Sequence, residues 1–214
     1  MSKEKIHRQQ TVGEELANTI SHGLGALLAL AGAVPLVAKA AVTGSALRTA
    51  SLAAYGISLV LLYTASAVYH GARDPRVKRV LRVMDHCSIF VLILGTYIPM
   101  SLLVVGGRTG WLLFLTNTTL AVVGITLNAI DLKRFDKVSM ALYALMGWLI
   151  VVALRAIVQA LPPLGLALLV AGGLAYTVGI VFYKSQRGYM HFVWHLFVLA
   201  GSALQYVCIA LYCV

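Results

Sequence analysis

The sequence predicts an all-α, polytopic membrane protein with seven transmembrane helices, a cytoplasmic N-terminus and a C-terminus on the outer side. Three observations predict this class. Of the 214 residues, 60% are hydrophobic and only 11% are charged, whereas soluble domains average about 25% charged residues. Apolar runs of about 20 residues, each long enough to cross a bilayer core, recur along the chain. Basic residues are concentrated in alternate connections between these runs.

Charged residues, glycines and prolines divide the chain into seven predicted helices. The connections are short, so consecutive helices should be antiparallel neighbours. We expect residues 1–214 to form a single seven-helix transmembrane domain, in which residues 1–14 are a polar cytoplasmic N-terminal segment. The predicted helices cover residues 20–40, 48–70, 83–105, 110–130, 138–158, 164–183 and 191–213.

Each boundary follows from a residue that is unfavourable in the bilayer core or in a helix interior. The first helix ends before Gly44, and the second runs from Arg48 to the basic connection that starts at Arg73. The third begins after Arg82 and stops at Gly106. Charges are costly in hydrocarbon, and glycine lowers helix stability, so each of these positions favours a helix end.

The later helices are bounded in the same way. The fourth ends at Asp131, the fifth begins after Lys137, and a pair of prolines that includes Pro162 separates the fifth from the sixth. The sixth stops at Lys184, and the seventh follows Gly188. Proline is tolerated at the start of a helix but not in its interior, so the proline pair favours a new helix there.

The distribution of lysine and arginine predicts the orientation. Thirteen of the 17 basic residues lie on the side of the N-terminus and four on the other side. Such an excess is typical of cytoplasmic loops, so we expect a multi-pass protein of the cell's inner (plasma) membrane. This arrangement accounts for the net charge of +10 without a nucleic-acid partner. The thirteen are Lys3, Lys5, Arg8, Arg73, Arg76, Lys78, Arg79, Arg82, Lys133, Arg134, Lys137, Lys184 and Arg187, and the four are Lys39, Arg48, Arg108 and Arg155.

Polar and ionisable side chains gather at the predicted cytoplasmic end of four helices that are far apart in the sequence. A charged group in a bilayer costs about 2.5–3.5 kcal/mol on insertion scales, so such groups usually face the bundle interior and have partners. We therefore expect these side chains to lie together. They are Glu15, Asn18, Ser21 and His22 at the first helix, Ser66 and His70 at the second, Asp85 at the third, and His191 and His195 at the seventh.

The histidines predict a metal site. His191 and His195 are four residues apart, a spacing that puts two imidazoles on one helical face, as in zinc sites of the HExxH kind. His70 can supply a third ligand from the second helix. Three imidazoles leave the fourth tetrahedral position of a zinc ion open for water, which is typical of catalytic zinc. Imidazoles also bind other divalent ions, and an HxxxH pair alone could serve interhelical hydrogen bonding.

Two further residues could take part in chemistry at such a metal. Asp85 can accept a proton from a zinc-bound water or hold that water in line. Ser66, one turn before His70, can hydrogen-bond the same water. Each has a simpler interpretation as well, because Asp85 could pair with Arg82 and a serine can serve helix packing.

As an ordered set, these motifs resemble the hemolysin III family, the bacterial branch of the progestin and adipoQ receptor superfamily. The motifs are ExxNxxSH, SxxxH, an aspartate on the third helix followed by GxxxP (Gly95 to Pro99), and HxxxH, within residues 15 to about 211. The superfamily is grouped with alkaline ceramidases among membrane hydrolases. The resemblance implies one zinc on the cytoplasmic side of seven helices. It implies that His70, His191 and His195 hold the zinc and that Asp85 positions water. The first motif carries over to Glu15, Asn18, Ser21 and His22, for which two roles stay open: to cap the first helix, and to brace the ligands.

The residues and the resemblance together favour a zinc-dependent, ceramidase-like hydrolase that acts on a lipid amide or ester. The alternative is a sensor of membrane lipid state with structural zinc. A cytolysin or pore is disfavoured because the outer halves of the helices are apolar, and Asn117, Asn128 and Gln205 suit interhelical hydrogen bonds. We expect membrane lipids, among them a lipid substrate, as partners. The oligomeric state is left open.

Overall fold

The computed structural model describes residues 8–214, and this part of the chain is helical with no strand. Six helical segments in it are long and apolar enough to cross a membrane. The prediction of an all-α, multi-pass membrane protein is therefore confirmed. Lys3, Lys5 and the first half of the polar segment at 1–14 lie outside the described residues. The elements are α1 (Val12–Val42), α2 (Ala46–Gly71), α3 (Pro75–Pro99), η1 (Met100–Val105), α4 (Gly107–Trp148), η2 (Leu149–Ala153), α5 (Leu154–Ala160), α6 (Pro163–Tyr183) and α7 (Met190–Tyr212).

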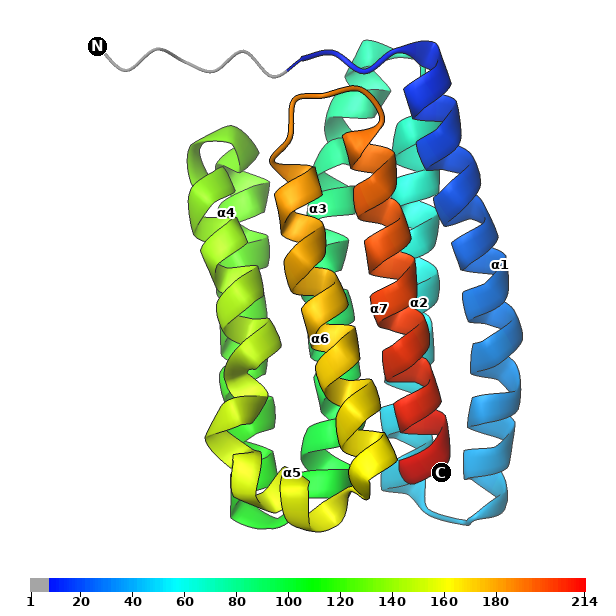
Figure 1. Ribbon diagram of the computed structural model, residues 1–214, viewed down its shortest axis with the longest axis vertical. Helices are drawn as coiled ribbons and strands as arrows, with labels where there is room; N and C mark the ends of the chain where they lie inside the picture. Colours follow the sequence, from blue (N-terminus) through cyan, green and yellow to red (C-terminus); the bar gives the residue numbers. More distant parts are fainter. Residues whose placement is uncertain (1–7) are drawn as a thin grey trace.

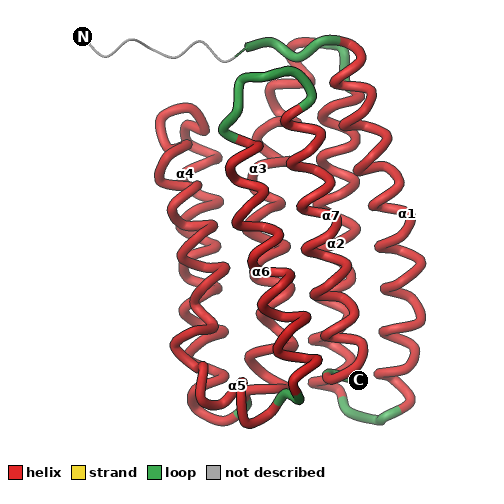
Figure 2. The backbone as a smooth tube through the Cα atoms, viewed as in Figure 1, coloured by secondary structure: helices red, strands yellow, loops and turns green. Residues whose placement is uncertain are grey.

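The helices form an upright bundle in which the chain alternates in direction (Figures 1 and 2). The start of α1, the α2–α3 connection and the α6–α7 connection lie at one end of the bundle, which we call the upper end. The α1–α2 connection, α5 and the C-terminus lie at the opposite, lower end. α1 packs against both α2 and α7, so the first and last of the described helices are neighbours.

Two helices start earlier than the hydropathy pattern predicts because polar residues cap them. At α1, Glu14 N–H donates to Thr11 Oγ1 (3.3 Å) and Thr11 N–H donates to Glu14 Oε2 (2.8 Å), which is a capping box. At α3, the N–H groups of Val77 and Arg76 donate to Asp74 Oδ1 (3.0 and 2.7 Å). These two hydrogen bonds lower the pKa of the Asp74 carboxyl. The caps extend both helices beyond the apolar run.

The long helix α4 folds back on itself at Asp131, whose φ of −159° and ψ of 95° are not helical. Asn117 Nδ2 donates to the carbonyl of Met146 across 29 residues at 3.3 Å. In a straight helix these residues would be about 43 Å apart, so the two limbs of α4 must be antiparallel. The limbs are also joined by Ser139 Oγ, which donates to Asn128 Oδ1 at 2.5 Å. The connection predicted between residues 130 and 138 is thus a sharp reversal followed at once by helix.

Two predicted helices are irregular in their lower halves. The third ends in the π-helical segment η1, which begins after Pro99. Proline has no N–H and cannot complete the regular hydrogen-bond ladder. The fifth is interrupted by the 3₁₀ segment η2, where Ile150 N–H donates to Tyr97 Oη (2.7 Å) and Tyr97 O–H donates to the carbonyl of Gly147 (3.0 Å). A side chain from α3 therefore competes for backbone groups of the second limb.

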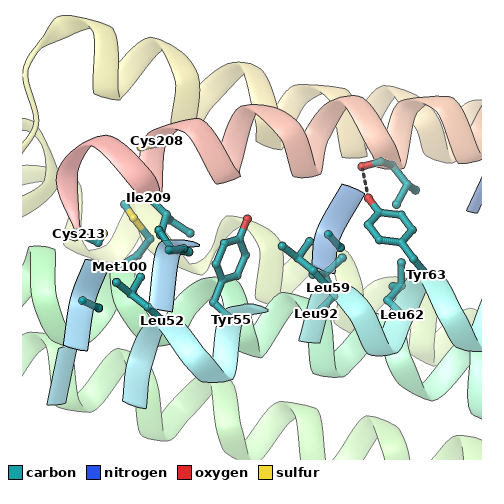
Figure 3. Packing of buried hydrophobic residues seen from close by; sticks show 14 of the residues in the cluster. Leu52, Tyr55, Leu59, Leu62, Tyr63, Leu92, Met100, Cys208, Ile209 and Cys213 are labelled. Carbon is teal, nitrogen blue, oxygen red and sulfur yellow. Dashed lines mark hydrogen bonds between the residues drawn. The ribbon is translucent and has the colours of Figure 1, made fainter. Parts of the chain in front are cut away.

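The main core lies between α1, α2, α3 and α7 and contains Leu52, Tyr55, Leu59 and Ile209 (Figure 3). Glycines permit the closest approaches between helices. A Cβ atom added at Gly124 of α4 would lie 2.1 Å from the ring of Phe90, which is fully buried on α3. The α3–α4 contact therefore requires glycine at this position.

We expect Gly124→Ala to lower the melting temperature in detergent, because the Phe90 ring must move. Overpacking of this kind costs about 1–3 kcal/mol. Thermal unfolding of the purified protein measures the effect. Gly23→Ala is the matched control, since a Cβ atom added at that helical position contacts nothing within 4 Å. Equal melting temperatures for the two variants would contradict this account of the α3–α4 contact.

Candidate metal centre

Three histidines converge at the upper end of the bundle. One ring nitrogen from each of His70, His191 and His195 lies within 4.8 Å of the other two. The ring centroids are 4.8–5.1 Å apart, and His70 and His195 are buried. Zn–N bonds of 2.0–2.1 Å place tetrahedral ligands about 3.4 Å apart, so small side-chain movements would bring these nitrogens onto one ion. The cluster could hold a metal.

Glu15 of α1 orients the His70 ring. The Nδ1 atom of His70 lies 2.7 Å from Glu15 Oε2. A carboxylate can only accept, so Nδ1–H donates to it and the lone pair of the neutral ring is on Nε2. Nε2 is buried and has no hydrogen-bond partner among the described residues. A ring held in this way, with its second nitrogen free, is the usual arrangement of a metal-binding histidine.

Ser21 orients the His195 ring by the same logic. Ser21 Oγ donates its single proton to the carbonyl of Asn18 at 2.9 Å. It lies 3.2 Å from His195 Nδ1 and can therefore only accept there, so Nδ1 carries the proton. The lone pair of His195 is thus on Nε2, as in His70. Two polar residues of α1 select the ligand-competent tautomer of two histidines on other helices.

The other two residues of the ExxNxxSH motif also lie at the cluster. Asn18 Nδ2 donates to Gln10 Oε1 (2.6 Å) and lies 3.4 Å from His70 Nδ1. The ring of His22 stacks on His195 with centroids 3.5 Å apart and planes 7° apart. Both nitrogens of His22 are buried without partners among the described residues. His22 therefore packs on a candidate ligand and is not one of the three convergent histidines.

Lys78 is a contact that sequence reasoning missed. Its Nζ lies 2.8 Å from Glu15 Oε1, the carboxylate oxygen that does not contact His70. Nζ also lies 5.0 Å from the centre of the Tyr69 ring. The sequence showed Lys78 only as one of the thirteen basic residues that indicate orientation, and nothing in its spacing distinguished it from the others.

Glu14 is the second residue that sequence reasoning missed. Its Oε1 accepts a hydrogen bond from the backbone N–H of Tyr189 (2.6 Å) and pairs with Arg8. Tyr189 has a φ of +60°, a conformation uncommon outside glycine, at the start of α7 and just before His191. Glu14 therefore fixes where the helix that carries two of the histidines begins. The capping-box pattern was the one signal that could have indicated it.

Asp85 and Ser66 lie beside the histidines, although neither belongs to the three-histidine group. Both line a cavity of about 290 Å³ that is also bounded by His22, His191 and His195. The structure thus places Asp85 and Ser66 at the same cavity as two of the three convergent histidines.

The cavity extends from this polar end far down the bundle, between α3, the second limb of α4, α6 and α7. Its lining includes Asp85 near the upper end and Met100 in the lower half. At 1.5 Å per residue, the stretch between them is about 22 Å long. The walls below the histidines are mostly apolar and include Ile157, Leu166 and Val198. This shape suits a long hydrocarbon chain with a polar head at the histidines.

Membrane-length helices that enclose three convergent histidines define a multi-pass membrane protein with a candidate metal centre. The sequence matches the family described as "Haemolysin-III related" over residues 10–206, and the chain belongs to this family.

Similar proteins span nearly the whole chain. It is 38% identical to the protein named "Hemolysin-3" of Bacillus cereus over 99% of this chain and 97% of that protein. It is 39% identical to the "Hemolysin-3 homolog" of Bacillus subtilis (strain 168) over 95% of this chain and 96% of that protein. A human relative named "Monocyte to macrophage differentiation factor" is 29% identical over 72% of this chain and 67% of that protein. The family resemblance found in the motifs is therefore confirmed.

We expect Glu15→Ala to weaken metal binding about 10- to 100-fold, because His70 loses the carboxylate that fixes its tautomer. Titration with zinc against a competing chelator measures the affinity of the purified protein. Asp74→Asn is the matched control, since it removes a carboxylate at the same end of the bundle but keeps an oxygen that can cap α3. Unchanged zinc affinity in Glu15→Ala would contradict the orienting role of this residue.

Proposed function

We propose that this protein is a zinc-dependent hydrolase that cleaves an amide or ester bond of a membrane lipid at the cytoplasmic side. The observation that carries the proposal is the three-histidine cluster, with a buried and unpartnered Nε2 on His70, at the head of a long apolar cavity. The cavity would hold an acyl chain and bring its carbonyl to the histidines. Family membership alone does not specify a reaction, so the proposal depends on the site.

In this proposal His70, His191 and His195 hold the zinc. A bound zinc ion polarises a carbonyl oxygen and lowers the pKa of bound water towards about 7. Asp85 accepts the proton from the attacking water and can return it to the leaving group. Ser66, buried beside it, hydrogen-bonds the water or the developing oxyanion. The apolar walls align the chain and limit the access of other water molecules to the reacting carbon.

The proposal includes the topology of the chain. Since α4 reverses at Asp131, we propose seven crossings with a cytoplasmic N-terminus and an outer C-terminus, in the plasma membrane. The upper end would then face the cytoplasm, in agreement with its excess of basic residues. Membrane lipids are the proposed partners.

The second candidate is a non-catalytic sensor of membrane lipid state in which zinc only joins helices. The observation that favours it is that one of the three histidines lies on α2 and the other two lie on α7. A metal bound to all three would join these helices. A pore is disfavoured because the cavity walls below the histidines are mostly apolar. Turnover of a lipid separates the enzyme from the sensor.

We expect Asp85→Asn to reduce kcat for hydrolysis of a long-chain ceramide or ester about 10²- to 10⁴-fold, because the proton acceptor is lost. Zinc content should stay the same as in the wild type. Asp136→Asn is the control, because Asp136 also lines the cavity but lies on α4. Full activity in Asp85→Asn, at normal zinc content, would remove this mechanism.

We expect removal of zinc with a chelator to lower the melting temperature and to abolish hydrolysis, with both restored when zinc is returned. The first change follows because a ligand that binds only the folded state stabilises it by mass action. In His191→Ala, neither the chelator nor added zinc should change the melting temperature or the rate of hydrolysis. A restored melting temperature without any turnover, across a panel of lipid amides and esters, would support the sensor instead.

We expect a membrane-impermeant maleimide to label Val42→Cys in intact cells but to label Lys133→Cys only in inverted vesicles. Val42 is 89% exposed at the lower end of α1, and Lys133 is exposed just after the reversal in α4. The three native cysteines are buried or half-buried, which limits background. Labelling of both positions from the outside would contradict the proposed seven-crossing topology.

A further inference from the structure

Gln205 is a polar residue in the apolar part of the cavity, remote from the histidines. It lies on α7, is 5% exposed and forms part of the cavity lining. Its Nε2 donates to the carbonyl of Leu169 on α6 at 3.0 Å. A Cβ atom added at Gly172 of α6 would lie 2.7 Å from this nitrogen, so a glycine makes room for the amide. The side chain is thus held firmly between α6 and α7.

The other end of the amide has nothing to bind. Gln205 Oε1 is buried and has no hydrogen-bond partner among the described residues. The bond to Leu169 requires the donor end at α6, so the acceptor is fixed in place. A buried acceptor without a partner is unfavourable, and native proteins rarely leave one unpaired without a functional reason. Here the unpaired atom belongs to a side chain that lines a ligand-sized space.

We propose that Gln205 Oε1 accepts a hydrogen bond from a hydroxyl group on the long chain of a lipid bound in the cavity. This inference names a substrate class for the site and rests on the proposed function for what occupies the histidine end. The cavity would thus prefer chains that carry an internal hydroxyl over fully saturated, unsubstituted chains.

The helix geometry predicts where on the chain this hydroxyl lies. Gln205 follows His195 on the same regular helix, about 15 Å further along its axis. An extended chain advances about 1.2 Å per bond, since a residue of three backbone bonds spans 3.3–3.6 Å. A head group at the histidines therefore places the hydroxyl about 12 bonds along the chain. Apolar residues such as Leu166 and Ile157 surround the space beyond, where an unsubstituted tail would continue.

Binding of three fatty acids to the purified protein tests the proposal. We expect 12-hydroxyoctadecanoate to bind about three- to tenfold more tightly than octadecanoate, the range that one net hydrogen bond provides. 2-Hydroxyoctadecanoate should gain no such advantage, because its hydroxyl lies beside the head group. Competition against radiolabelled octadecanoate gives the three affinities in one detergent.

Variants test whether Gln205 causes the preference for the 12-hydroxy acid. Gln205→Met and Gln205→Leu should bind 12-hydroxyoctadecanoate and octadecanoate equally. Asn117→Leu is the matched control, because Asn117 is also a buried amide with an unpaired oxygen but does not line the cavity. Its preference should match that of the wild type.

Equal affinities of the wild type for the 12-hydroxy and unsubstituted acids would overturn the proposal, as would a preference that survives in Gln205→Met. The first result would indicate that a buried water satisfies Oε1 instead, and the second that another group binds the hydroxyl. Should a Gln205 variant fail to fold, the comparison between the 2- and 12-hydroxy acids on the wild type still decides. Absence of hydrolysis would contradict the proposed enzyme but would leave this binding preference intact, so the two failures are distinguishable.

Discussion

The carboxylate of Glu15 is the interaction on which the upper end of the bundle depends. One oxygen accepts from His70 on α2 and the other pairs with Lys78 on α3, so a single side chain of α1 joins three helices. A carboxylate at this depth is tolerated because both oxygens have charged or hydrogen-bonded partners. The contact between Glu15 and His70 also selects the tautomer of His70. One hydrogen bond therefore both joins α1 to α2 and prepares the ring to bind a metal.

The hydropathy of the chain predicted the helices well because a bilayer requires apolar runs of a fixed minimum length. Their ends were less predictable, since they depend on hydrogen bonds between particular side chains and the backbone. Thr11 and Asp74 extend α1 and α3 as caps, whereas Tyr97 withdraws Ile150 N–H from the regular helix. The contact between Tyr97 and Ile150 joins residues that no local pattern links, whereas the caps are local patterns that hydropathy does not register.

Some residues of the candidate site could be predicted from the sequence, and others could not. The spacing of His191 and His195 and the clustering of polar residues at helix ends indicated the three histidines. Residue type and spacing along the chain are sufficient to recognise such a site. Glu14 and Lys78 were not recognised, since their importance depends on a partner distant in the sequence. The unpaired oxygen of Gln205 could not have been predicted either, because the sequence suited an interhelical hydrogen bond and did not show that half of the amide stays free.

The packing of α1 against α7 has a consequence for biosynthesis. Proteins are made from the N-terminus, so α1 and α2 leave the ribosome long before α7. Glu15 and His70 can meet early, but His191 and His195 arrive only with α7. A nascent chain therefore cannot complete its three-imidazole cluster until α7 has been made. A product that terminates before α7 would insert several helices into the bilayer and still lack two of the three histidines, so a metal held by all three could bind only after α7 is in place.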